Sequence, residues 1–196
     1  MTRWPTEVVA RIVASFSARS ELVVLLTDRT DTARRGSDSV RATVEGLGRE
    51  VRVLSALAPV PALLEDPVEA QVVIAALKPH TPLEHDRARA WAALLRAGGI
   101  LAILTHPGRH GRRLVDPTGP IVTAAQAADL LYLQHIVVLP TNADDIAMPP
   151  AHDSGASSDH RDQRMSTRDS YPRHRRVHGD LLIFINANAP EPAGQR

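Results

Sequence analysis

Polar side chains stand directly after three apolar runs of the sequence, at positions where a strand would end and a ligand would bind. They are Thr27, Asp28, Arg29 and Asp31 after the run 21–27, Lys78 and His80 after the run 71–77, and Thr105 and His106 after the run 100–105. Hydroxyl, carboxylate and imidazole groups hold polar ligands and exchange protons with them. The same residue types also solvate loops and cap helices, and Asp31 and Thr32 are especially suited to capping. The sequence alone leaves both interpretations open.

The sequence lacks the motifs of several common chemistries. Its nine histidines include none in a helical His–Glu zinc motif, and the absence of cysteine removes thiolate ligands and disulfides. We therefore predict no metal site. The chain also has no Gly-x-Ser-x-Gly elbow, no phosphate-binding Walker loop and no Gly-x-Gly-x-x-Gly fingerprint. This pattern disfavours hydrolases, P-loop NTPases and conventional nicotinamide dehydrogenases.

A basic segment in the last third of the chain is a candidate for binding nucleic acid. Residues 161–176 contain six arginines and two aspartates, and the densest part holds Arg173, Arg175 and Arg176. Arginines of this density can contact phosphates in a salt-dependent manner. The mixed charges are also typical of a solvated flexible loop, which is the simpler interpretation.

Helical and strand patterns alternate along the chain. Strands are predicted at 21–27, 50–54, 71–77, 100–105, 136–140 and 180–186, and helices at 7–16, from Asp31 or Thr32 to Gly46 or Gly48, at 83–96, and from Thr123 to about Leu133. Residues 59–67 and 106–120 are predicted loops, the former with at most one short helix. Residues 141–178 carry little apolar content, and we expect a long mobile insertion there.

The alternation predicts an α/β fold with right-handed crossovers and a mostly parallel sheet. Continuous β-branched and leucine runs, such as 22–26, suit strands that are buried on both faces. We expect a three-layer, doubly wound sandwich in which the last two strands form an antiparallel hairpin at one edge. The expected domain spans residues 1–188, followed by a frayed tail at 189–196.

Composition limits the class of protein. The 196 residues carry 23 Lys and Arg against 22 Asp and Glu, for a formal charge of +1, so the charge balance does not demand a polyanionic partner. The longest apolar runs are far shorter than the roughly 20 residues of a membrane helix, and no secretion signal is evident. We expect a soluble, cytoplasmic protein with no membrane partner. Only 3% of the residues are aromatic, so stacking platforms for bases are sparse.

One junction carries a family resemblance. The predicted helix that ends Trp91-Ala-Ala-Leu-Leu-Arg-Ala-Gly-Gly99 is followed directly by the strand 100–105. This junction, together with the order of elements over residues 4–188, resembles the class I S-adenosylmethionine-dependent methyltransferase fold. Trp4-Pro5 followed by the helix 8–13 is similar to the corresponding region of DNA amino-methyltransferases. The glycine pair ends the helix and turns the chain into the strand.

The resemblance implies a cofactor, a site and partners. The cofactor would be S-adenosylmethionine, contacted by Thr27, Asp28 and Asp31. Lys78, Pro79 and His80 would hold the methyl acceptor, with the His80 ring stacked on a flipped base. DNA or another nucleic acid would be the acceptor or partner, and Arg173, Arg175 and Arg176 would contact its phosphates. A protein partner is a further possibility.

The sequence departs from the family pattern at three points. The loop after the run 21–27 has no glycine before Gly36, and no acid follows the strand 50–54. In the stretch 76–80, one proline and one possible stacking ring are present, but the polar anchor of the family is missing. These departures favour an alternative in which the fold is retained without catalysis. In that case the chain would serve as a binding or scaffolding domain for nucleic acid or a protein partner.

Overall fold

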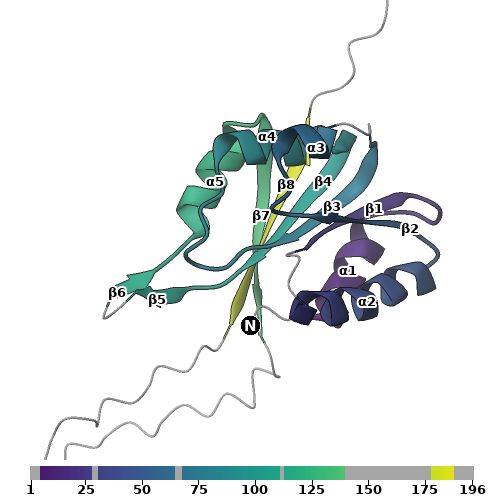
Figure 1. Ribbon diagram of the computed structural model, residues 1–196, viewed down its shortest axis with the longest axis horizontal. Coiled ribbons are helices and arrows are strands. Elements are labelled where there is room, and N and C mark those ends of the chain that lie inside the picture. Colours follow the sequence, from purple (N-terminus) through teal and green to yellow (C-terminus); the bar gives the residue numbers. More distant parts are fainter. Residues whose placement is uncertain (1–4, 28–30, 65–67, 111–112, 140–177, 188–196) are drawn as a thin grey trace, which may run out of the picture.

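The computed structural model describes residues 5–27, 31–64, 68–110, 113–139 and 178–187. A six-stranded sheet with the order β2-β1-β3-β4-β8-β7 forms its centre (Figure 1). Its strands are β1 (Leu22–Thr27), β2 (Glu50–Ser55), β3 (Ala70–Ala76), β4 (Leu95–Thr105), β7 (Leu130–Val138) and β8 (Gly179–Asn186). The first four strands are parallel, whereas β8 runs antiparallel to both β4 and β7. The predicted α/β sheet with an antiparallel edge hairpin is confirmed.

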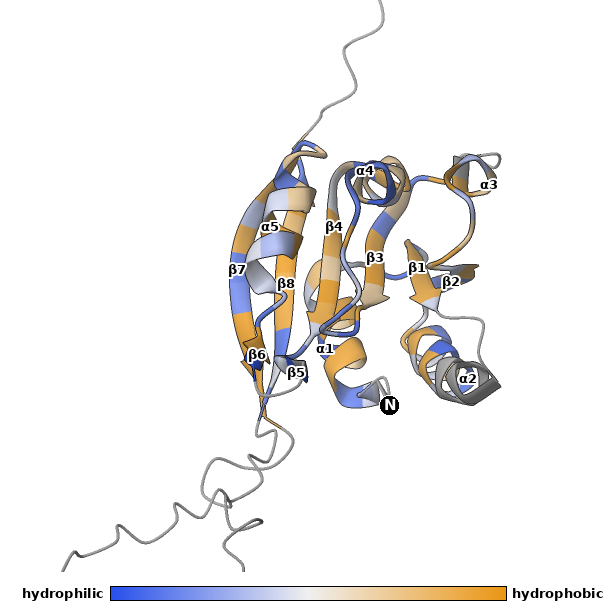
Figure 2. Ribbon diagram, turned by 60° about the vertical axis from the view of Figure 1, so that its left-hand side comes forward, coloured by the Kyte–Doolittle hydropathy of each residue, from blue (hydrophilic) through white to orange (hydrophobic). Residues whose placement is uncertain are grey.

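Helices cover both faces of the sheet (Figures 1 and 2). One face packs against α1 (Thr6–Phe16) and α2 (Asp31–Gly46), and the other against α3 (Val60–Leu64), α4 (His85–Ala93) and α5 (Thr118–Gln126). The three layers follow from the amphipathic helices, which must bury their apolar faces against the sheet.

The inner strands are buried on both sides. In β1, Val23 and Leu25 pack beneath α1 and α2, whereas Val24 and Leu26 belong to the opposite cluster, which contains Trp91. Alternate side chains of a strand point to opposite faces, so a strand that is covered twice must be apolar at every position. This is why the strand 21–27 reads as a continuous apolar run.

The predicted helix from Thr123 to about Leu133 is wrong in its position. Helix α5 begins at Thr118 and ends at Gln126, and β7 already begins at Leu130. The connecting residue Asp129 has a φ of 61°, a left-handed conformation that stops the helix. The alanine-rich composition conceals this stop because the usual glycine is replaced by an aspartate.

Two further boundaries differ from the prediction. The predicted loop 106–120 contains a short hairpin of β5 (Gly108–His110) and β6 (Arg113–Val115). Helix α4 ends at Ala93, and β4 begins before the glycine pair instead of after it. Gly98 has a φ of 73°, and a Cβ on Gly99 would lie 2.8 Å from the carbonyl oxygen of Ala70. The glycines therefore allow an irregularity in the β3–β4 pairing, and they lie beyond the turn that ends α4.

Some predictions fall outside the described residues. The predicted mobile insertion 141–178 lies outside them except for residue 178, and the predicted tail 189–196 lies outside them entirely. Residues 1–4 of the predicted domain are also outside the described ranges. Within the described ranges, no helix is long and apolar enough to span a membrane.

Candidate functional site

The strand order reverses between β1 and β3. The chain leaves β1 for β2 on one side and then crosses to β3 on the other, so these neighbouring strands diverge in their connections. In open α/β sheets, ligands bind beyond the carboxyl ends of the strands at such a point. Thr27 ends β1 with 9% of its surface exposed, and its carbonyl oxygen accepts a 2.9 Å hydrogen bond from the Ala56 amide. This edge is the candidate binding site.

The predicted acceptor residues lie at the same edge. Lys78, Pro79 and His80 form a turn after β3 in which the Thr81 amide donates a 3.0 Å hydrogen bond to the Lys78 carbonyl. The Lys78 and His80 side chains are exposed, and Pro79 is half-buried. Because β1 and β3 are adjacent, the structure brings this turn to the same sheet edge as Thr27 and the start of α2 at Asp31. Asp28, Arg173, Arg175 and Arg176 lie outside the described residues.

The hairpin of β5 and β6 packs against this turn. A Cβ on Gly108 would lie 2.5 Å from both Cβ and Cγ of Pro79 and 3.4 Å from Nε2 of His80. Only glycine permits this close approach of the β5 backbone. The contact partly covers Pro79, and sequence reasoning missed it. The Pro107-Gly108 pair was the available signal, because such dipeptides mark tight local geometry.

Arg87 is a second residue that sequence reasoning missed. Its guanidinium reaches from α4 to the loop after β2, where Nη1 donates to the carbonyl oxygens of Ala56 and, at 3.3 Å, Ala58. The described residues that directly follow β2 and β3 include no carboxylate. A cation therefore braces the loop after β2, where the family resemblance implied an acid. No sequence motif around Arg87 signalled this contact.

A polar cluster lies farther along the same edge, at the junction of β4, β8 and β7. The His135 Nε2 and Asp180 Oδ1 atoms are 2.8 Å apart, and the Asp180 side chain is only 5% exposed. Thr105 is the direct strand partner of Asp180. Among the described residues, Asp180 Oδ2 and Thr105 Oγ1 are buried without a hydrogen-bond partner. Two such oxygens can receive N–H or O–H groups.

A second carboxylate acts electrostatically on this cluster. The pKa of Asp116 is lowered from its ordinary value, chiefly because the Thr118 backbone N–H donates to Oδ1 at 2.9 Å. The Thr118 side chain adds a further hydrogen bond, and the charge on His135 makes a smaller contribution in the same direction. His135 is therefore near one buried carboxylate and within the electrostatic reach of another. Across the described ranges, no group of three or more His, Asp or Glu residues has a geometry suited to a metal ion.

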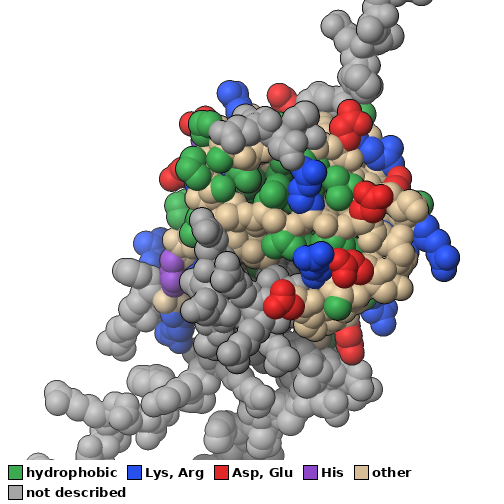
Figure 3. Space-filling model, turned by 45° about the vertical axis from the view of Figure 1, so that its right-hand side comes forward, with side chains coloured by type: hydrophobic (Ala, Val, Ile, Leu, Met, Phe, Trp, Pro, Cys, Tyr) green, Lys and Arg blue, Asp and Glu red, His purple; other side chains and the backbone are tan. Residues whose placement is uncertain are grey.

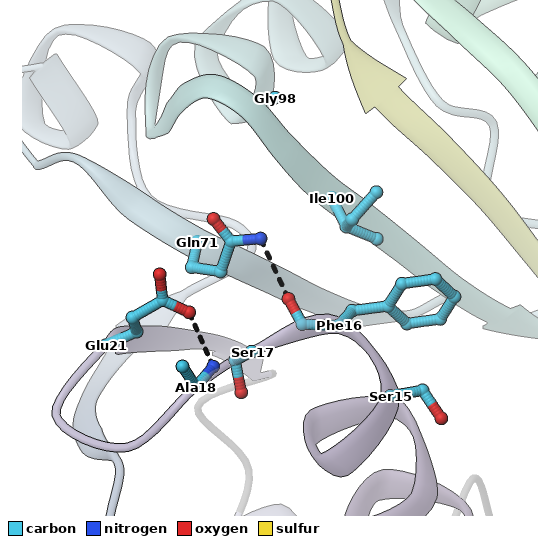
Figure 4. Close-up of a pocket in the computed structure, with 8 residues that line it drawn as sticks. All are labelled: Ser15, Phe16, Ser17, Ala18, Glu21, Gln71, Gly98 and Ile100. Carbon is cyan, nitrogen blue, oxygen red and sulfur yellow. Dashed lines mark hydrogen bonds between the residues drawn. The ribbon is translucent and has the colours of Figure 1, made fainter.

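A hollow of about 390 Å³ lies at the opposite end of the sheet (Figure 4). It is lined by Ser15, Phe16, Ser17, Ala18, Glu21, Gln71, Gly98 and Ile100. The Gln71 Nε2 donates to the Phe16 carbonyl at 2.8 Å, and a carboxylate oxygen of Glu21 accepts from the Ala18 amide at 2.6 Å. These bonds fasten the end of α1 to the amino ends of the strands. The hollow is therefore a structural joint, away from the edge where ligands of such sheets bind.

Charge is mixed on the surface that Figure 3 presents. Lys and Arg side chains alternate with Asp and Glu side chains, and no large area of one sign is visible on that face. A nucleic-acid interface would be expected to show a basic stripe. The basic residues singled out in the sequence lie mostly in 161–176, outside the described ranges.

The chain matches no protein-family model, and no curated protein matches it by sequence. Its fold is similar to that of the Burkholderia thailandensis 1,6-didemethyltoxoflavin-N1-methyltransferase with bound 1,6-didemethyltoxoflavin and S-adenosylhomocysteine. The TM-score is 0.54 at 12% identity, covering 95% of this chain and 80% of the other. A protein described as a methyltransferase, in complex with the Haloferax volcanii Trm112 methyltransferase activator, gives 0.53 at 12% identity over 96% and 91% of the two chains.

A third structure, described as a methyltransferase from Bacillus halodurans, gives a TM-score of 0.50 at 10% identity. It covers 94% of this chain and 99% of the other. At these identities the likeness concerns the fold. The chain has the Rossmann-like class I methyltransferase fold, as its sequence predicted.

Proposed function

We propose that this chain is a divergent S-adenosylmethionine-dependent methyltransferase-like protein that binds its cofactor at the carboxyl edge between β1 and β3. The observation that carries the proposal is the meeting of Thr27, the start of α2 and the turn 78–80 at the point where the strand order reverses. The fold supports it, since a structural neighbour holds S-adenosylhomocysteine.

The hydrogen-bond donors at this edge suit the carboxylate end of the cofactor. The Thr27 hydroxyl, the Lys78 ammonium and the first backbone N–H groups of α2, which a helix leaves without partners inside itself, are appropriate partners for the cofactor's carboxylate. Among the described residues directly after β2, the ribose of the cofactor would find no carboxylate to accept hydrogen bonds from its hydroxyls. Ala56 and Leu57 follow this strand, and the Arg87 guanidinium donates to the Ala56 carbonyl in their loop. When bound, the cofactor would supply an electrophilic methyl group, and the protein would contribute orientation.

The acceptor would lie near Lys78, Pro79 and His80, with His80 offering a ring for stacking. The cluster of Thr105, His135 and Asp180 lies farther along the same edge on β4, β7 and β8, but its two unpartnered oxygens are buried, so an acceptor would reach them only if this end of the sheet opened. DNA is our proposed acceptor class, with Arg173, Arg175 and Arg176 contacting phosphates. A protein partner is compatible with the fold, because a neighbour is in complex with an activator.

A second candidate function is a non-catalytic binding or scaffolding domain. Two contacts favour it: Arg87 fills the loop after β2, and Gly108 packs on Pro79 at the turn that would hold the acceptor. In this alternative the sheet persists while the pocket no longer accepts the cofactor.

Calorimetric titration of the full chain with S-adenosylmethionine and S-adenosylhomocysteine separates the two functions. Saturable binding that weakens by about tenfold or more in Lys78→Ala supports the methyltransferase proposal, since a charge-assisted hydrogen bond is worth about 1.5–3 kcal/mol. Arg89→Ala, an exposed cation on α4, is the control. Flat titrations with a folded protein favour the scaffold. For nucleic acid, deletion of 155–178 should abolish salt-sensitive binding to duplex DNA if the basic segment carries it.

A further inference from the structure

Among the residues that the structure describes, no strand pairs with the outer edge of β7. β7 lies at the end of the strand order and pairs with β8 (Figure 2). Its exposed apolar side chains are Leu131, Tyr132, Leu133, Ile136 and Val137, with Leu139 following directly. Positions 130–139 contain no Lys, Arg, Asp or Glu. The edge is therefore mostly apolar and carries no Lys, Arg, Asp or Glu, and its polar residues are Gln134 and His135.

The opposite edge of the sheet is built differently. The strand β2 places Glu50 and Arg52 among its six residues. Charged side chains and prolines are the usual devices that prevent a free edge from pairing with another strand. β7 has neither of them, although both edges belong to the same sheet. The contrast indicates that pairing is tolerated at β7 and opposed at β2.

We propose that β7 is a self-association edge, at which a second copy of this chain adds its own β7 antiparallel across a two-fold axis. A strand without Lys, Arg, Asp or Glu offers little complement to a strongly acidic or basic partner, whereas two copies set mostly apolar side chains against each other. A two-fold interface needs a self-complementary strand, and β7 meets this condition. The sheet would then continue from one protomer into the next.

The pairing register follows from an irregularity in β7. The β7–β8 ladder shifts between Tyr132 and Gln134, so regular strand geometry runs from Gln134 to Val138. A two-fold axis at the centre of this stretch sets Ile136 opposite its own copy and His135 opposite Val137. Such an interface leaves the β1–β3 edge uncovered, so it is compatible with either proposed function.

A single-cysteine variant tests the register directly, because the chain has no cysteine of its own. Ile136→Cys places two thiols across the axis, where directly opposed Cα atoms are about 4.5–5.5 Å apart, within the range that a disulfide spans. Under mild oxidation of the full chain we expect a covalent dimer. Val53→Cys on β2 is the matched control, since Val53 is 39% exposed and Ile136 is 37% exposed. Equal cross-linking of the two variants, or none in Ile136→Cys, overturns the proposal.

Sedimentation of the unmodified chain supplies a second measurement. We expect a concentration-dependent dimer whose dissociation constant rises at least about tenfold in Ile136→Lys, because like charges then face each other across the strands. Val53→Lys should leave the dimer intact. If Ile136→Lys fails to fold, Val137→Lys, at a position 55% exposed, provides the same test. A wild-type chain that remains monomeric at high micromolar concentration contradicts the proposal.

Discussion

The imidazole of His135 sits 2.8 Å from a carboxylate oxygen of Asp180, and this pair joins the edge strand β7 to the buried strand β8. The two residues lie diagonally across the strand pair, on the face that α5 partly covers. Burial of the Asp180 side chain removes water from one of its oxygens, so His135 is its main described partner. The pair has a structural consequence that is independent of any ligand.

Removal of the imidazole should destabilise the fold. His135→Ala removes the hydrogen-bond partner of the buried Asp180 carboxylate and leaves only the His178 imidazole, 3.9 Å away, at an expected cost of about 1–3 kcal/mol in the free energy of unfolding. Denaturant titration measures it. His85→Ala, at an exposed position on α4, is the control and should change stability by less than about 0.5 kcal/mol. The double variant His135→Ala/Asp180→Asn should recover part of the lost stability. If its loss instead equals the sum of the losses in the two single variants, His135 and Asp180 are not energetically coupled.

The glycine pair before the regular part of β4 should tolerate little change. Gly99→Ala sets a methyl group 2.8 Å from the Ala70 carbonyl oxygen and 2.9 Å from that of Arg96. We expect a loss of about 1–3 kcal/mol from this overpacking. Gly46→Ala in α2 meets no atom within 4 Å and should stabilise by up to about 1 kcal/mol. Thermal unfolding gives the melting temperatures of the two variants. Equal melting temperatures for Gly99→Ala and Gly46→Ala would refute the steric explanation.

Arg87 should contribute to stability through the loop after β2. Arg87→Ala removes the donor that holds the Ala56 and Ala58 carbonyls, and we expect a loss of about 1–3 kcal/mol. Arg89→Ala on the same helix is exposed and should be close to neutral. Hydrogen exchange at residues 56–58 should accelerate in the first variant alone. Unchanged exchange there would show that the contact is not maintained in solution.

The contribution of Asp116 to the free energy of unfolding should disappear in acid. Its pKa is lowered in the folded state, so the carboxylate stabilises the fold above its unfolded pKa of about 3.9 and loses that effect as the pH falls through the folded value. Asp116→Ala should cost at most about 1 kcal/mol near neutral pH, because the residue is exposed, and nothing at the acid end. Denaturation as a function of pH measures the difference. Asp116→Asn keeps the hydrogen-bond acceptor and should lack the pH dependence.

The buried strands were predictable because a strand that is covered on both faces of the sheet is apolar at nearly every position, which gives a continuous apolar run in the sequence. The runs 21–27 and 71–77 coincide closely with β1 and β3, and the sheet class follows from their alternation with amphipathic helices. Edge strands carry a weaker signal. The alanines before residues 130–133 predict that a helix continues through them, because the stop at Asp129 uses an aspartate in an unusual left-handed conformation.

The candidate site was predictable only in part. Residues at strand ends converge because parallel strands finish at one edge, so the meeting of Thr27 with the turn 78–80 could be foreseen. Contacts between segments that are distant in the sequence could not be predicted. Arg87 reaches a loop that lies far from it in sequence, and β5 packs on Pro79 through the absence of a side chain at Gly108. Neither contact leaves a periodic or compositional trace.

The place of β8 in the sheet has a consequence for biosynthesis. Residues 179–186 insert between β4 and β7, which were made earlier, and pair Thr105 with Asp180. Until these residues leave the ribosome, β4 has an open edge, and Leu101 and Ile103 lack their strand partners Phe184 and Leu182. Contacts between segments so distant in sequence slow folding, because loop closure precedes any gain from pairing. The nascent chain therefore leaves the facing edges of β4 and β7 unpaired until β8 has been synthesised.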